Sequence, residues 1–393
     1  MYSEEDINSA VGAGALSAEA AASFRAHMSA VRQLPRGSEE DFRLINSFND
    51  IFVSIGIVIL LVAVGAIGQA LAGIVAPAPD YSIIFNGVAD PTPEQMNALA
   101  SASNLHDSFA ACFAGLLVAA AAWPLAEFFT RRRRMALPSI LLLLAFVGGV
   151  FAAILGTTMA VVASTSVEVS PLYVAVAALC AAGAAFLHWR RFMVPITMAA
   201  GAAGVAVTVI ALILSAIGTG NTNETVVLSL VCAAGLAVFA FAMRWDMSDR
   251  ERITRRSDVA FWLHLLAAPM IAHPIFALLG VTEGTDLNVG AAIGVLAVYI
   301  GFGLIALTID RRALLVSALA YVLFALAFLF DRFGAVELTF ALTALVIGSA
   351  LLSLSAFWQP IRRSVVTLLP ENLQAKLPAT ADAPLPTATA VAA

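Results

Sequence analysis

The chain has 393 residues, of which 61% are hydrophobic and only 12% are charged, and its formal net charge is −5. A soluble domain is about 45–50% apolar and about 25% charged, so a water-soluble fold of this length would lack a polar surface. The small negative charge gives no indication of nucleic-acid binding. Residues 51–76 and 138–166 contain no charged residue. Such blocks predict transmembrane helices, because about 20 apolar residues cross the hydrocarbon core of a bilayer.

Residues 1–45 are polar and alanine-rich, and we expect them to form a cytoplasmic helical hairpin. Ser3-Glu-Glu-Asp6 has the pattern of a capping box, and Ser17 is placed to cap the next helix after two glycines. A second Ser-Glu-Glu-Asp, at residues 38–41, predicts a third helix that continues into the membrane. The segment is too short to bury a core of its own, and it lacks the pattern of a cleaved signal peptide.

Residues 46–358 are predicted to be an all-α, polytopic transmembrane bundle of about ten spanning helices, with both termini inside the cell. Residues 77–107 form a long external connection, in which Thr92-Pro93-Glu94 predicts the start of a short interfacial helix that ends near Asn104. Residues 359–393 are predicted to be a cytoplasmic tail that is largely disordered beyond Pro378. The expected spans are about 50–75, 108–129, 138–163, 171–189, 193–217, 225–244, 259–280, 289–309, 313–330 and 337–357.

Arginines gather at alternate connections between the spans, which predicts the orientation of the protein. The clusters lie at residues 131–134, 190–191, 250–256, 311–312 and 362–363. With ten spans and an inner N-terminus, Arg332 is the only basic residue outside. The first four clusters recur about every 60 residues, which fits either a duplicated two-helix unit or the plain length of two helices with their loops. Only one basic residue is a lysine, and we take this as codon bias in a bacterium and place the protein in its inner membrane.

The seventh span carries the candidate ligand-binding residues: His273, Trp262, Phe276 and His264. The two histidines are nine residues apart, so they are about half a turn out of phase and do not share a metal ion. Trp262, His273 and Phe276 fall on one face of the helix, which two prolines interrupt. A polar residue inside lipid is a functional hypothesis by default, so these four side chains are the candidates.

Other polar residues and cysteines give no further candidate site. Cys112, Cys180 and Cys232 each lie alone in an apolar run, and no catalytic residue, metal ligand or cofactor motif is predicted. Asp310 lies at a helix end beside Arg311, which we interpret as partial neutralisation of an interfacial arginine. Glycines on several spans are expected to allow close helix packing.

The layout of a short helical hairpin followed by about ten Ala/Leu-rich spans with arginine-rich bends resembles bacterial polytopic membrane proteins of unknown function. This resemblance implies no active site. We expect a non-enzymatic protein, transporter-like or a scaffold, that handles an apolar or lipid-like ligand. One alternative is a membrane-embedded enzyme or haem protein that uses His273 or His264. Another is a membrane sensor that signals through the N-terminal hairpin. The bilayer is the expected partner, together with a second copy of the chain or another membrane protein.

Overall fold

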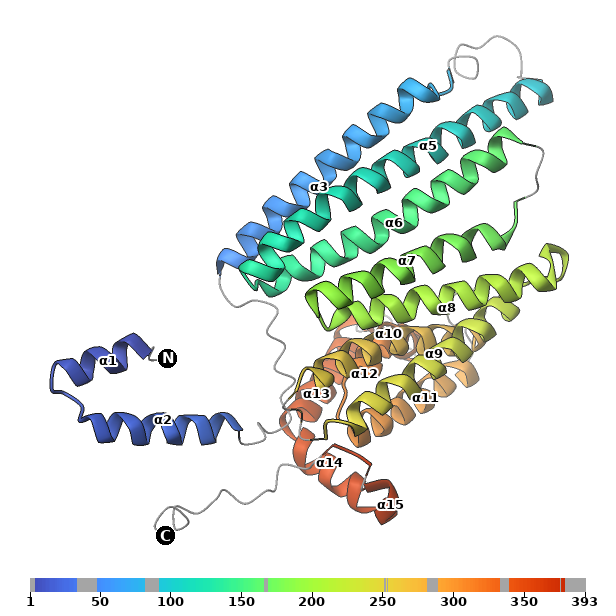
Figure 1. The fold of residues 1–393 in the computed structure, drawn as a ribbon. Helices are drawn as coiled ribbons and strands as arrows, with labels where there is room; N and C mark the ends of the chain where they lie inside the picture. The colour runs from blue at the N-terminus through green and yellow to red at the C-terminus, as the bar shows by residue number, and fades with distance from the viewer. Residues whose placement is uncertain are drawn as a thin grey trace.

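The computed structural model describes residues 4–33, 48–81, 92–165, 169–250, 252, 254–280, 289–332, 339–374 and 376–378. Every secondary-structure element in these ranges is helical (Figure 1). The elements are α1 (Glu4–Gly12), α2 (Ala18–Gln33), α3 (Phe48–Val75), α5 (Pro93–Ala126), η1 (Glu127–Arg132), α6 (Ala136–Ser164), α7 (Pro171–Phe192), α8 (Ile196–Ile217), η2 (Thr219–Asn221), α9 (Glu224–Met247), α10 (Arg255–Leu278), α11 (Val289–Ile309), α12 (Ala313–Arg332), α13 (Thr339–Ala356), α14 (Trp358–Thr367) and α15 (Glu371–Gln374).

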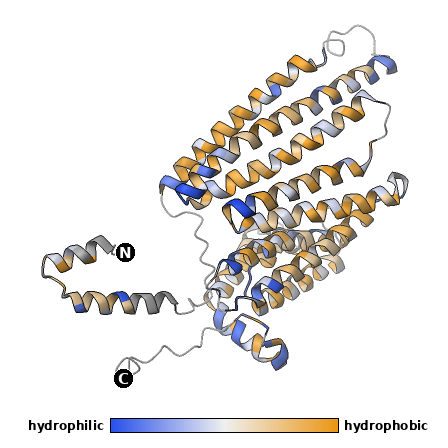
Figure 2. Ribbon diagram, viewed as in Figure 1, coloured by the Kyte–Doolittle hydropathy of each residue, from blue (hydrophilic) through white to orange (hydrophobic). Residues whose placement is uncertain are grey.

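Among the described residues, nine helices are long and apolar enough to cross a membrane, and hydrophobic residues cover most of their length (Figure 2). A tenth span is present only if α13 and α14 count as one, although their axes differ by 73°. The expected all-α bundle is therefore confirmed, with nine to ten spans. The first four arginine clusters lie at one end of the bundle, where η1, α7, α9 and α11 end. We call this end the arginine-rich end.

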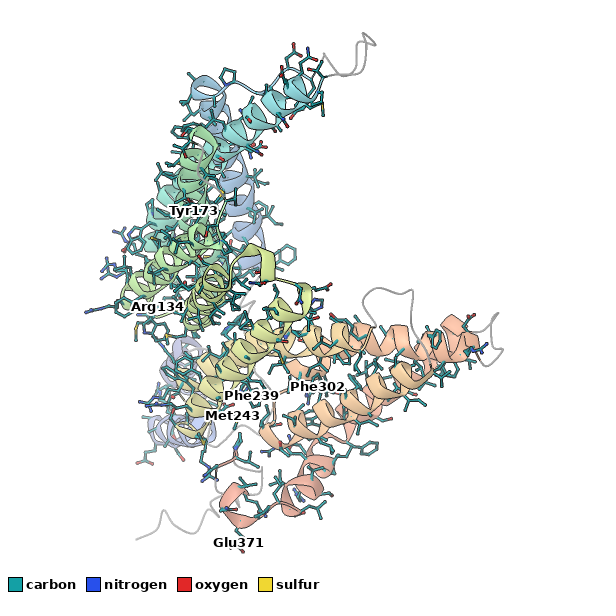
Figure 3. All side chains as sticks on the ribbon, turned by 90° about the vertical axis from the view of Figure 1, so that its right-hand side faces the viewer. Arg134, Tyr173, Phe239, Met243, Phe302 and Glu371 are labelled. Atoms are coloured by element: carbon teal, nitrogen blue, oxygen red, sulfur yellow. The ribbon has the colours of Figure 1, made fainter. Side chains whose placement is uncertain are left out.

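The helices pack in two groups that α8 connects. α3, α5, α6 and α7 lie side by side in chain order, and α8 packs against α7 as well as α9 and α10 (Figure 1). In the second group α10 contacts α9 and α12, and over half of its apolar window is buried. Phe239 and Phe302 lie among the helices of this second group, whereas Arg134 lies at the end of the first (Figure 3). The helix that carries the four candidate residues is therefore the most enclosed of the nine.

Glycine brings α5 and α6 into backbone contact. A Cβ atom built on Gly149 would lie 2.7 Å from the Gly115 carbonyl oxygen, and one built on Gly156 would lie 2.5 Å from the Ser108 oxygen. Neither position has room for a side chain, so these residues fit the predicted role of small residues in lipid, where close packing replaces the hydrophobic driving force. Gly148, the preceding residue of α6, faces open space, and a Cβ atom there would meet nothing within 4 Å.

Some predicted boundaries are wrong. The interfacial helix does not stop near Asn104: α5 is continuous from Pro93 to Ala126, and η1 extends it to Arg132. Its predicted start is confirmed, because the Thr92 hydroxyl accepts from the Gln95 N–H in a capping box. Part of the predicted external connection is therefore helix. The capping boxes expected at residues 3–6 and 38–41 include residues outside the described ranges, as does the tail beyond residue 378. The tail before that point forms α14 and α15.

The same backbone conformation recurs at the four bends of the arginine-rich end. Arg134, Met193, Arg252 and Asp310 are the non-glycine residues with positive φ in the described chain, with values of 54° to 56°. They are 59, 59 and 58 residues apart. Non-glycine residues rarely adopt the left-handed region, so four occurrences at nearly equal intervals are informative. This regularity favours the duplicated two-helix unit over a chance spacing of arginines.

Candidate functional site

The four predicted residues do not form a single site. His264 is 2% exposed and lies one-third of the way along α10 from the arginine-rich end, whereas His273 is exposed on the outside of the helix nearer its other end. Phe276 is fully buried, and Trp262 is half-buried against Phe261. Pro269 and Pro274 lie inside α10, which remains one helix. The shared face predicted for Trp262, His273 and Phe276 is therefore divided between the interior and the surface of the bundle.

His273 has a polar neighbour although it lies at the surface. Its Nδ1 atom is 2.6 Å from the hydroxyl of Tyr321 on α12. The Tyr321 ring stacks on Phe276, with 4.6 Å between the ring centroids. These three side chains link α10 to α12 in the second helix group. They form a polar contact between helices, and they line neither of the two cavities described below.

His264 belongs to a buried cluster of charged side chains at the arginine-rich end. Its Nε2 atom is 2.9 Å from Asp246 Oδ2 on α9, so the Nε2–H tautomer donates to the carboxylate. The second carboxylate oxygen accepts from Arg311 Nη2 at 2.6 Å. Asp246 is 1% exposed and Arg311 is 3% exposed. The same guanidinium donates to the Ser257 carbonyl oxygen at 3.1 Å, which leaves this ion pair well supplied with partners.

A second buried carboxylate, Asp310, is the residue that precedes Arg311 in the chain. Its oxygens accept from Arg252 Nη1 at 3.0 Å and from the indole N–H of Trp358 at 2.7 Å. Arg362 lies 3.8 Å away and donates to the Pro378 carbonyl oxygen at 2.8 Å. The expected pairing of Asp310 with its neighbour Arg311 is therefore wrong. Asp246 and Asp310 instead bind Arg311 and Arg252, which are distant in the chain, so the two clusters connect α9, α10, the α11–α12 bend and α14.

An apolar groove opens next to these clusters, between α12 and α13. Its volume is about 220 Å³, and it is lined by Arg312, Leu315, Val316, Leu319, Leu351, Leu354, Ser355 and Trp358. The α12 residues recur at every turn, so they form one face of that helix. Val316 is 67% exposed, so the groove is open to the side of the bundle. At one end the Arg312 guanidinium lies 4.7 Å from the centroid of the Trp358 ring.

The opposite end of the molecule has a second cavity, of about 360 Å³, between α5 and α6. Its lining includes Asn104, Asp107 and Ser108 besides apolar residues such as Leu155 and Met159. Among the described residues, no group of three or more His, Cys, Asp or Glu side chains is arranged to hold a metal ion. The three cysteines are free and lie apart from one another in the chain.

Sequence reasoning missed Asp246, Arg311 and Trp358, which hold the clusters and the groove together. Arg311 and Asp246 are 65 positions apart, and Trp358 and Asp310 are 48 apart. A sequence shows that each lies near a helix end but not which helix ends meet. The adjacent arginines 311 and 312 carried one usable signal, because a single neighbouring aspartate cannot neutralise two guanidinium groups.

The long apolar helices of the described chain fit one class, the multi-pass α-helical membrane proteins. Comparison of the chain with known protein families, with curated proteins and with solved structures finds no match.

Proposed function

We propose that this protein is a non-enzymatic membrane protein, transporter-like or a scaffold, that holds a lipid-like ligand in the groove between α12 and α13. The supporting observation is the groove itself, whose walls are Leu315, Leu319, Leu351 and Leu354 and whose side is open. An unfilled apolar groove forfeits dispersion contacts, and it has too few polar partners to hold ordered water. An acyl chain supplies the missing contacts without a polar group to satisfy.

We further propose that the arginine-rich end faces the cytoplasm, so that both termini lie inside a bacterial inner membrane. The positive-inside rule supports this orientation, because connections at the other end contain Arg332 as their only basic residue. The ten-span count belongs to the same proposal, since an odd number of spans would place the termini on opposite sides. The groove then lies in the inner half of the bilayer.

The alternatives draw less support from the geometry. An enzyme or haem protein would use His264 or His273, yet neither histidine lines either of the two cavities in which a substrate or haem could lie. A sensor would signal through α1 and α2, which pack against each other. Its test is deletion of residues 2–37, which should abolish signalling and leave the bundle folded. Self-association or a membrane-protein partner fits a scaffold equally well.

Lipid retention after purification tests the proposed function. Leu319→Trp fills the groove, and Leu345→Trp adds the same bulk at a position on α13 that is 66% exposed and does not line the groove. We expect mass spectrometry of the purified proteins to find fewer lipid molecules on Leu319→Trp and an unchanged number on Leu345→Trp. Equal retention by both variants would contradict a ligand in the groove.

A further inference from the structure

We propose that the ligand of the groove is a lipid with an anionic headgroup, a phosphate or carboxylate, and that Arg312 binds this headgroup. The inference rests on the proposed function, because it names the chemical class of the ligand for the same groove. Three observations support it: the Arg312 guanidinium lies at one end of the groove, the neighbouring arginines bind other groups, and the apolar walls of the groove extend away from Arg312 along α12.

The Arg312 guanidinium is positioned but not neutralised. It lies over the Trp358 ring and lines one end of the groove. Among the described residues, Arg312 has neither an ion pair nor a side-chain hydrogen bond to protein. Stacking on an aromatic ring leaves the edge of a guanidinium, with its five N–H donors, open to a planar or tetrahedral anion. A partly buried cation without a counter-ion is costly, and an anionic headgroup would remove that cost.

The neighbouring arginines are engaged elsewhere. Arg311 binds Asp246, Arg252 binds Asp310, and Arg362 binds the Pro378 carbonyl oxygen. The two buried carboxylates, Asp246 and Asp310, therefore bind Arg311 and Arg252 rather than Arg312. Trp358 has a double role in this arrangement, since its N–H donates to Asp310 while its ring face supports Arg312. The Asp310 cluster thus fixes the indole that positions the headgroup-binding residue.

The groove runs in the direction that an amphipathic ligand requires. Arg312 immediately precedes α12, which starts at Ala313, and Leu319 lies two turns further along. Two turns correspond to about 10 Å along the helix axis, so the charge lies at the membrane surface and the apolar walls extend inward. The N-terminus of α12 also favours a negative charge, because the helix dipole is positive there. The anionic headgroup would therefore contact Arg312, and the acyl chain would contact the apolar walls.

Native mass spectrometry with added lipid tests the proposal. Phosphatidylglycerol and phosphatidylcholine are titrated separately into delipidated protein, and Arg312→Gln is compared with Arg190→Gln. Arg190 lies at another bend with its guanidinium 5.9 Å from the Phe186 ring, so its substitution removes the same charge away from the groove. We expect the wild type to prefer phosphatidylglycerol, Arg312→Gln to weaken that binding by about tenfold or more, and Arg190→Gln to leave it unchanged. Arg312→Lys keeps the charge and should retain part of the preference.

The outcomes separate this inference from the proposed function. If Leu319→Trp lowers binding of both lipids but Arg312→Gln leaves the preference intact, the groove holds a ligand and the anionic headgroup is refuted. If Leu319→Trp changes the binding of neither lipid, the groove is not the ligand site, and the proposed function itself is refuted. Equal losses in Arg312→Gln and Arg190→Gln would show general attraction to basic residues and overturn the site. Binding of glycerol phosphate as tight as that of phosphatidylglycerol would overturn the lipid in favour of a soluble anion.

Discussion

The buried ion pair of Asp246 and Arg311 gives the sharpest prediction for stability. The two side chains are 1% and 3% exposed, and they meet at 2.6 Å with His264 and Ser257 as additional partners. Asp246→Leu removes the carboxylate that binds the buried Arg311 guanidinium at 2.6 Å, so this ion pair is broken from one side. Breaking a buried pair from one side costs about 3–5 kcal/mol, most of which is the uncompensated charge. Arg311→Met should cost a similar amount, because it leaves the carboxylate with His264 alone.

The double variant Asp246→Leu/Arg311→Met should be more stable than either single variant. With both charges gone, no ion of this pair remains buried, and the remaining loss is the unsatisfied His264 and Ser257, about 1–3 kcal/mol. The free energy of unfolding is measured by titration with a denaturing detergent in mixed micelles, followed by circular dichroism. Glu127→Gln is the matched control at another bend, because the Glu127 and Arg191 side chains are 29% and 41% exposed. Solvent screens that pair, so we expect little change.

A near-additive result would refute this reasoning. If each single variant loses less than about 1 kcal/mol and the double variant loses their sum, the pair is solvated and does not anchor the α11–α12 bend.

Three further predictions concern packing, hydrogen bonding and topology. Gly149→Ala should lose about 1–3 kcal/mol of unfolding free energy, because the added methyl group would lie 2.7 Å from backbone. Gly148→Ala, which faces open space, should gain up to about 1 kcal/mol, and equal effects of the two substitutions would disprove the close contact. Tyr321→Phe should lose about 0.6–1.7 kcal/mol by removing one hydrogen bond to its histidine partner, and no loss at all would show that the bond is absent in lipid. A reporter fused after Asn223 should be periplasmic and one after Asp249 cytoplasmic, and the reverse result would invert the proposed orientation.

The spans are predictable from sequence because apolar length is a local property. The start of α5 is predictable for the same reason, since Thr92 and Gln95 lie within one turn. The stop expected near Asn104 is wrong because no proline or glycine separates Glu94 from Asp107, so an alanine-rich helix continues. The bend between α13 and α14 is not predictable from the sequence. Around residue 357 the residues change from apolar to basic, and this change indicates the end of a span but not a bend.

The candidate site is predictable only in part. His264 stands out because a histidine in an apolar helix is unusual, and the structure gives it a buried carboxylate partner. Asp246 does not stand out, since an aspartate near a helix end is commonplace in sequence. The proposed headgroup residue, Arg312, differs from Arg311 by one position and not by residue type, so only the packing of α12 and α14 distinguishes them.

The most direct measurement of a lipid in the α12–α13 groove uses a photoreactive, clickable anionic lipid in membranes that contain the protein. After irradiation, peptide mapping should place the adducts on α12 near residues 315–319 and on α13 near residues 351–355. The α3 helix is an internal reference, because Phe52, Ile59 and Val62 are 73%, 64% and 67% exposed and lie away from the groove. Enrichment of adducts in the groove over α3 is the expected result. Adducts distributed in proportion to exposed apolar area, with α3 as heavily labelled as α12, would contradict the central proposal.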